Sequence, residues 1–536
     1  MLERYLEYSR SLLDQLFSDR RYQLQLLGYI VVVVLYFLTH LIYFIDYPAF
    51  ATDEIFYIMK AIWWKKTGQP SVPGWYGDPH LEFTNPPAWS WLLLVMFDFF
   101  GTSILVVRLA SLTFGICNLV LVFLVSRELG KEEPWRGYLI GIIAGLILTF
   151  DVELVEYSRI GYLDNPMNLF LTAFLLFYLQ YLKTENINFA WIAGGCAGIG
   201  IWFKLTTAVI FVGLGLFTLT NHKIKQRKLD AILRIQAVVA IFVVIYVVWG
   251  LSMDPYQFAY ENLFQITKTY DADPIGFWAA VLFGRRLGWN QKFIDFFRLF
   301  IIFAFLSPIF YFKDHIKRKK DAKFFYEGVY FIFCLTVGII IFFSSTKSLY
   351  DYYLAGVASF YSILLAISFF IMYDIMIFIL EKLLVFARQP KNLQDVFREA
   401  IQITMIMVVL LSFSIKISGD PLEIQYENQE NTEILSYVYE NIPKNNTLVA
   451  PITIGPWLNA SGYSVYTTWF PSSTPDWIVN RYIYNYTLNY LILHNDYSYV
   501  LNSTHFGFPN GVLPYYVIYN FPNHDLYMLN STALKD

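Results

Sequence analysis

The chain has 536 residues, of which 57% are hydrophobic and 15% charged, and its formal net charge is −3. Soluble domains carry about 25% charged residues, so this composition indicates a polytopic membrane protein and excludes an ordinary soluble domain. The chain has no basic tract of the kind that binds nucleic acid, so we expect no nucleic-acid partner. The three cysteines lie in hydrophobic runs, which predicts buried apolar side chains instead of disulfides or a metal site.

The hydropathy pattern predicts a helical membrane protein with about eleven spans, because about 20 apolar residues cross a bilayer. The predicted spans are 26–45, 105–126, 137–151, 166–182, 189–204, 205–220, 232–252, 297–312, 324–343, 354–380 and 399–416. Residues 1–25 are charged and amphipathic, and the span after them is too long for a signal-peptide core. The chain therefore divides into this N-terminal segment, a membrane domain (26–416) with a first outer loop (46–104), and a C-terminal domain (417–536).

The distribution of positive charge predicts the orientation of the chain. Lysine and arginine collect in the loops at 127–136, 183–188, 221–231, 313–323 and 381–398, which the positive-inside rule assigns to the cytoplasm. The N-terminus is then cytoplasmic, and an odd number of spans makes the C-terminal domain extracellular. Asn-x-Ser/Thr sequons agree, because all lie after residue 417 and such acceptors have meaning only on the outer face of a cell membrane. They begin at Asn445, Asn459, Asn485, Asn502 and Asn530.

The C-terminal domain has the pattern of a small α/β unit. Residues 432–442 and 476–483 predict helices, and residues 447–450, 497–501 and 515–519 predict strands.

The outer loops hold most of the polar residues that could perform chemistry. Asp53 and Glu54 follow the first span, and carboxylates at a membrane surface are costly unless they have a role. A structural explanation is also open, since Thr52 could cap a short helix at 53–66 whose dipole favours acids in its first turn. Further on, Pro86 and Pro87 predict the start of a new helix at Ala88.

Later outer segments carry cations. Residues 153–166 predict a turn between the third and fourth spans, and this turn contains Arg159 and Asp164. These two residues could pair with each other, and a lone cation such as Lys204 could extend its charge to the membrane surface. Arg285 and Arg286 lie in the 253–296 loop, and Lys347 and Tyr352 follow the ninth span.

A chemical argument connects these residues. No pool of ATP or nucleotide sugar exists outside the cell, so a transferase acting there needs a donor delivered through the membrane, such as a polyprenyl-phosphate sugar. The leaving phosphate gains negative charge in the transition state, which arginine or lysine stabilises, and the acceptor hydroxyl needs a base, usually a carboxylate. A transferase of this kind therefore needs at least cations and an aspartate on the outer face of the membrane.

Several motifs resemble the GT-C glycosyltransferases of the protein O-mannosyltransferase and aminoarabinose-transferase (ArnT-like) kind. They come in the family's order over residues 50–355: Asp53-Glu54, Asn85-Pro86-Pro87, Arg108-Leu109-Ala110-Ser111, Ser158-Arg159 with Leu163-Asp164, Gly194-Gly195 through Lys204, and Lys347 with Tyr352-Tyr353-Leu354. The resemblance implies a membrane glycosyltransferase (hexosyl or pentosyl transfer, such as mannosyl transfer) with a dolichyl- or other polyprenyl-phosphate donor. Its acceptor would be a glycan, lipid or protein in glycoprotein or glycan assembly. The sequons and composition suggest an archaeal member.

The resemblance also implies roles for matched residues. Asp53 would be the catalytic base, and Glu54 would support it or help hold a cation. The residues assigned to the donor and its phosphate are Arg159, Asp164, Lys204, Arg285, Arg286, Lys347 and Tyr352. The sequence departs from the family at Asn85, where the pattern has His or Lys. No loop could hold the inserted β-trefoil of eukaryotic members, which argues against protein Ser/Thr as the acceptor.

Two other functions stay open on the sequence alone. A transporter or flippase with an outer ligand-binding domain is the first alternative, although such proteins usually place polar residues in mid-span and show internal repeats. An inactive scaffold that presents the C-terminal domain is the second. No cofactor is certain; Asp53, Glu54 and Asp164 could bind a divalent cation through oxygen.

Overall fold

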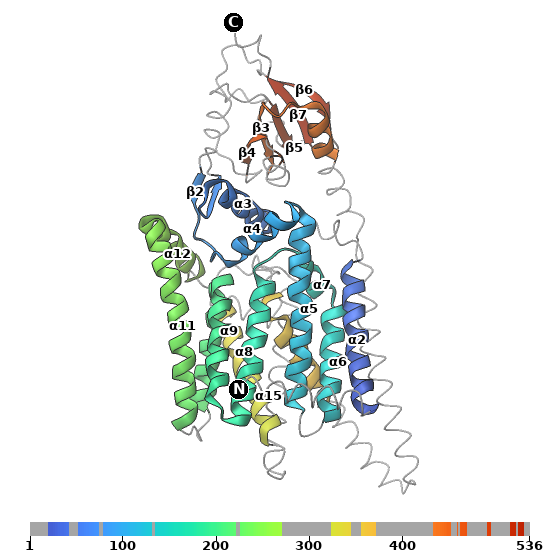
Figure 1. Ribbon diagram of the computed structural model, residues 1–536, viewed down its shortest axis with the longest axis vertical. Helices are drawn as coiled ribbons and strands as arrows, with labels where there is room; N and C mark the ends of the chain where they lie inside the picture. The colour runs from blue at the N-terminus through green and yellow to red at the C-terminus, as the bar shows by residue number, and fades with distance from the viewer. Residues whose placement is uncertain are drawn as a thin grey trace.

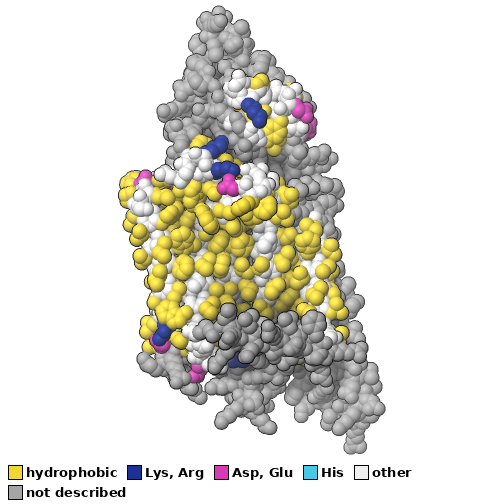
Figure 2. Space-filling view, in the orientation of Figure 1, with side chains coloured by type: hydrophobic (Ala, Val, Ile, Leu, Met, Phe, Trp, Pro, Cys, Tyr) yellow, Lys and Arg dark blue, Asp and Glu magenta, His cyan; other side chains and the backbone are white. Residues whose placement is uncertain are grey.

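The described residues form a helical bundle with a small mixed sheet at one end (Figure 1). The computed structural model describes residues 20–41, 52–73, 79–130, 134–220, 226–270, 323–344, 355–370, 433–451, 463–468, 490–494, 515–520 and 524–529, with residues 458 and 461. Hydrophobic side chains cover the visible middle of the bundle, and the charged side chains on this face lie near its two ends (Figure 2). This is the distribution expected of a protein whose middle faces lipid.

Helices occupy the predicted spans wherever the structure describes them. They are α2 (Arg20–Leu41), α5 (Ile104–Leu129), α6 (Pro134–Phe150), α8 (Asp164–Thr184), α9 (Ile187–Phe203), η1 (Leu205–Val209), α10 (Ile210–Thr220), α11 (Gln226–Met253), α15 (Lys323–Ser344) and a helix at 358–370. Among the described helices, Gln23–Leu41, Ile104–Leu129 and Leu229–Met253 are long and apolar enough to cross a membrane. The predicted spans 297–312 and 399–416 lie outside the described residues, so the number eleven stays a prediction.

Short polar side chains set several helix starts. Ser103, Asp151 and Asn186 accept hydrogen bonds from the backbone N–H groups of Val106, Leu154 and Asn188, at the starts of α5, α7 (Val152–Arg159) and α9 respectively. Such N-caps satisfy donors that have no partner within the helix.

The predicted turn at 153–166 is wrong in one respect, because Val152–Arg159 forms the helix α7. The Asp151 cap starts this helix, and Leu154 is buried beneath it. The turn itself is limited to residues 160–163, between α7 and α8.

The first outer loop forms a compact layer at the end of the bundle. It contains α3 (Thr52–Thr67), the antiparallel strands β1 (Ser71–Pro73) and β2 (Pro79–Leu81), and α4 (Ala88–Phe100), which begins at the residue predicted from Pro86-Pro87. Ile58, Trp89 and Leu93 are buried in a cluster of their own with Val107 of α5. α12 (Pro255–Tyr270) packs against this layer through Phe258, which contacts Phe83.

The C-terminal residues form a five-stranded sheet in the order β4-β3-β5-β7-β6. The strands are β3 (Thr447–Pro451), β4 (Ser464–Thr468), β5 (Tyr490–His494), β6 (Tyr515–Asn520) and β7 (His524–Leu529). β3 is parallel to both β4 and β5, whereas β7 is antiparallel to β5 and β6. The predicted helix at 432–442 appears at 433–441 and buries Ile434 and Val438 against Leu448. The elements predicted at 476–483 and 497–501 lie outside the described residues.

Leu435 joins the C-terminal unit to the outer-loop layer. This leucine packs against both the Ile434–Leu448 cluster and the cluster around Trp89. The sheet therefore lies over α3 and α4 (Figure 1). The domain boundaries and the side of the membrane on which this end lies stay predictions.

Glycine determines how closely α10 approaches α15. A Cβ on Gly213 would lie 2.6 Å from the Cα of Leu335, and a Cβ on Gly338 would lie 2.6 Å from the backbone nitrogen of Gly213. Small residues allow such close packing of membrane helices, where association depends on van der Waals contact.

We predict that Gly213→Ala destabilises the bundle by about 1–3 kcal/mol, because the new methyl group meets backbone that cannot move aside. Thermal unfolding of the detergent-purified protein measures the effect. Gly215→Ala is the matched control in the same helix, since a Cβ there meets nothing within 4 Å. Equal melting temperatures for the two variants would contradict this packing.

Candidate functional site

Segment 157–165 comprises the end of α7, the turn at 160–163 and the start of α8, and most of the polar contacts described below involve it. Residues 160–165 are all buried. The Ser111 hydroxyl of α5 lies within hydrogen-bonding distance of the carbonyl oxygens of Ser158 (2.9 Å) and Ile160 (2.7 Å). The Asn165 amide also donates to the Ile160 carbonyl, at 3.0 Å, and to Ser111. Side chains from two helices thus fix the path of this segment.

Glu54 ties α3 to the same segment. One carboxylate oxygen accepts the backbone N–H of Gly161 at 2.9 Å, and the other lies 3.4 Å from the Arg108 guanidinium. Both charged side chains are fully buried. Trp89 of α4 donates its indole N–H to the Gly161 carbonyl at 2.9 Å. A Cβ on Gly161 would lie 2.3 Å from a methyl carbon of Val107, so only glycine permits this approach.

Asp53 precedes Glu54 in the first turn of α3. Its side chain is outside what the structure describes, as is that of Thr52. Because Glu54 is held at both oxygens, the first turn of α3 is held next to segment 157–165. The described contacts of Glu54 are with Arg108 and Gly161, and its predicted role as a support for Asp53 or a cation ligand stays a prediction.

Two of the cations predicted to bind phosphate, Arg159 and Lys204, lie in the described residues and have protein partners there. Arg159, at the end of α7, donates to the carbonyl of Thr39 near the end of α2. Lys204 lies 2.7 Å from both carboxylate oxygens of Asp164. Lys204 therefore does not simply extend to the surface, since its side chain is 12% exposed. The backbone at Gly356 lies close to this pair, because a Cβ added to Gly356 would lie 3.1 Å from a carboxylate oxygen of Asp164.

A second buried charged cluster was not expected from the sequence. Lys60 of α3 is fully buried, lies 2.6 Å from Glu82 and donates to the Asn85 carbonyl at 3.0 Å. Glu261 of α12 accepts the backbone N–H of Phe83. The cluster holds the turn that precedes Pro86-Pro87. Only the placement of Lys60 within an otherwise apolar helix face could have indicated it.

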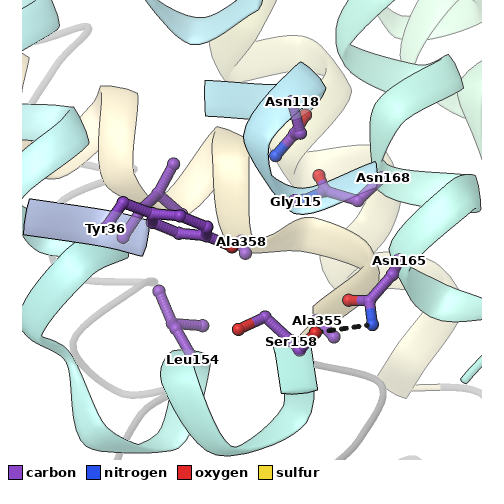
Figure 3. A pocket seen from close by; sticks show the side chains of 10 residues that line it. Tyr36, Gly115, Asn118, Leu154, Ser158, Asn165, Asn168, Ala355 and Ala358 are labelled. Atoms are coloured by element: carbon purple, nitrogen blue, oxygen red, sulfur yellow. Dashed lines mark hydrogen bonds between the residues drawn. The ribbon is translucent and has the colours of Figure 1, made fainter. Parts of the chain in front are cut away.

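A polar-lined cavity lies beside segment 157–165 (Figure 3). Its volume is about 20 Å³, enough for a water molecule. Its polar lining comes from Asn118 of α5, Ser158 of α7, and Asn165 and Asn168 of α8. Asn118 also donates to Ser359 at 2.6 Å, which connects α5 to helix 358–370.

Four predicted site residues, Arg285, Arg286, Lys347 and Tyr352, lie outside the described residues. Within the part of the chain that the structure describes, no three His, Cys, Asp or Glu side chains form a group that could hold a metal ion. The question of a divalent cation at Asp53 stays open.

Comparisons with known proteins agree with this architecture. Residues 84–249 match the family model of dolichyl-phosphate-mannose-protein mannosyltransferases. The structure is similar to ArnT from Cupriavidus metallidurans, solved bound to undecaprenyl phosphate, with a TM-score of 0.60 and 13% identity over 95% of this chain and 98% of that one. It is also similar to the archaeal oligosaccharyltransferase AglB from Archaeoglobus fulgidus, solved with an inhibitory peptide and a dolichol-phosphate, with a TM-score of 0.55 and 12% identity over 90% of this chain and 70% of that one. No curated protein sequence matches the chain.

The chain has the GT-C glycosyltransferase fold. The resemblance inferred from the ordered motifs is thereby confirmed at the level of fold. Within this GT-C bundle, Asn85-Pro86-Pro87, Arg108, Arg159, Asp164 and Lys204 all fall inside the matched region. The roles of the individual site residues stay predictions.

We predict that Glu54→Gln destabilises the GT-C bundle by about 3–5 kcal/mol, because it leaves the Arg108 charge buried without its counter-charge. The double variant Glu54→Gln/Arg108→Gln should recover much of that loss, since neither member of the pair is then charged. Thermal unfolding of the two variants and of Arg108→Gln gives the coupling energy. Additive losses would show that the pair does not act as a unit.

The buried position of Glu261 predicts that the stability of the folded protein depends on pH. Burial, and then the nearby charge of Glu82, raise the pKa of Glu261 above its ordinary value of 4.5. The folded state therefore holds the proton more tightly than the unfolded state, and stability falls as pH rises from about 4.5 through the raised pKa. Glu261→Gln removes this loss, keeps an oxygen that can accept from Phe83 and no longer repels Glu82.

Thermal unfolding from pH 4 to pH 8 measures the difference. We expect Glu261→Gln to melt about 1–3 °C above wild type at pH 8 and at the same temperature near pH 4. Glu433→Gln, at an exposed position, is the control. A Glu261→Gln advantage that is constant with pH would contradict the proposed titration.

Proposed function

We propose that this protein transfers a sugar from a polyprenyl-phosphate donor, such as dolichyl-phosphate mannose, to a glycan, lipid or protein acceptor on the outer face of the membrane. The observation that carries the proposal is the convergence of α2, α3, α7 and α8 on segment 157–165. This convergence brings the first turn of α3, with Asp53, to the end of the bundle that holds Arg159 and the Asp164–Lys204 pair.

The arrangement suits phosphate as a leaving group. Arg159 and Lys204 are cations in a largely buried setting, where electrostatic stabilisation of developing charge is stronger than in water. Lys204 would exchange part of its interaction with Asp164 for the phosphate. Asp53, beside the structural Glu54, would accept the proton of the acceptor hydroxyl.

Both structural neighbours support this class of donor. The solved structures hold undecaprenyl phosphate in ArnT and a dolichol-phosphate in AglB. At 12–13% identity these proteins share the fold, and the sugar and acceptor of this chain are questions for experiment. A transporter or flippase is the alternative, and it would leave the buried cation–carboxylate cluster at one end of the bundle without an evident use.

We predict that Asp53→Asn lowers sugar transfer by about 10²–10⁴-fold, the usual contribution of a general base. The assay supplies radiolabelled polyprenyl-phosphate mannose or glucose to membranes containing the protein and follows label into acceptors. Asp98→Asn is the matched control, because Asp98 of α4 is half-exposed and paired with Lys65, 2.7 Å away. Undiminished transfer by Asp53→Asn would move the base elsewhere, and no transfer by folded wild type with any donor would favour the transporter.

A further inference from the structure

The last turn of α2 contacts the last turn of α7 through two successive residue pairs. Arg159 donates to the carbonyl of Thr39, and the next residue of α2, His40, lies 2.6 Å from the Ser158 hydroxyl through its Nε2. His40 is fully buried. An ionisable side chain at such a depth in a span calls for a specific role.

The hydrogen bonds of His40 define its tautomer. Its Nδ1 lies 2.7 Å from the carbonyl oxygen of Tyr36, which can only accept, so Nδ1 carries the proton. In the neutral ring Nε2 is then an acceptor, and the single proton of the Ser158 hydroxyl has two acceptors in reach, His40 Nε2 at 2.6 Å and the Val155 carbonyl at 2.9 Å. The ring also stacks on Tyr36, with centroids 3.8 Å apart, so its plane is fixed from within α2.

The position of Ser158 explains why this anchor matters. Ser158 lines the cavity together with Tyr36 and Leu154 (Figure 3). Polar contacts from α2 to the side chains of Ser158 and Arg159 add to the contacts of Ser111 and Asn165 with the backbone at the end of α7.

We propose that His40 is a positioning residue that acts through Ser158 to orient the Arg159 guanidinium toward the phosphate of the lipid donor. A guanidinium presents its N–H groups in a rigid fork. Holding the Ser158 side chain against α2, and one guanidinium N–H of Arg159 on the Thr39 carbonyl, therefore determines where the fork points. The inference rests on the proposed function and adds a residue outside the family-matched region 84–249.

The test measures donor KM and kcat separately, with dolichyl-phosphate mannose and the full-length protein in membranes. We expect His40→Ala to raise the donor KM about tenfold and to lower kcat as well, because the Arg159 contact with the phosphate is weakened and the charge that develops there in the transition state is stabilised less. A merely structural role would instead reduce the amount of active protein, lowering Vmax without changing KM. His40→Gln, which can still accept from Ser158, should recover most of the KM.

A double-mutant cycle tests the route of the effect. If His40 acts through Ser158, then Ser158→Ala and the double variant should raise KM no more than His40→Ala does. Val32→Ala removes a buried side chain of the same helix, 2% exposed, and should leave KM unchanged. An unchanged KM in His40→Ala, or additive effects in the cycle, would overturn the inference while the transferase stands. Absence of transfer by wild type would overturn both.

Discussion

The buried Glu54–Arg108 pair is the constraint on which the polar end of this molecule depends. Neither side chain is exposed, so each buried charge is stabilised by the other, and the Gly161 amide satisfies the second carboxylate oxygen. This contact brings together three segments distant in sequence: the start of α3, the second turn of α5 and the α7–α8 connection. A glycine at position 161 and the indole of Trp89 complete the arrangement.

The same end of the bundle separates charges that hold structure from charges proposed to perform chemistry. Glu54, Lys60, Glu82 and Glu261 all have contacts with backbone or with a neighbouring charge that fix the outer-loop layer. Arg159 contacts a carbonyl and Lys204 a carboxylate, and a phosphate could replace part of either interaction. Under the proposed function, this end of the bundle would bind an anionic lipid headgroup while the contacts that maintain its fold stay in place.

The sequence predicted helices and their limits well, because hydropathy and proline are local signals. The start of α4 at Ala88 follows from Pro86-Pro87. The predicted spans agree with α5 and α8 within three residues and with the starts of α2 and α11 within six. The helix α7 was missed because eight residues with three charged side chains have no membrane signal, and only the cap at Asp151 marks the start. The sequence indicated Glu54 and Arg159 as important but could not show their partners, because the backbone groups of Gly161 and Thr39 have no signature in a residue pattern. His40 and Glu261 were missed because their partners, the Ser158 hydroxyl and the Phe83 backbone N–H, are distant in sequence and have no signature in a residue pattern.

The most direct test of the account is a structure of the protein with dolichyl-phosphate mannose bound, determined for the Asp53→Asn variant so that the donor survives. The account predicts the phosphate in contact with Arg159 or Lys204, the Glu54–Arg108 pair unchanged, and the sugar on the side of residue 53. A phosphate bound at the opposite end of the bundle, or a donor that displaces Glu54 from Gly161, would contradict it.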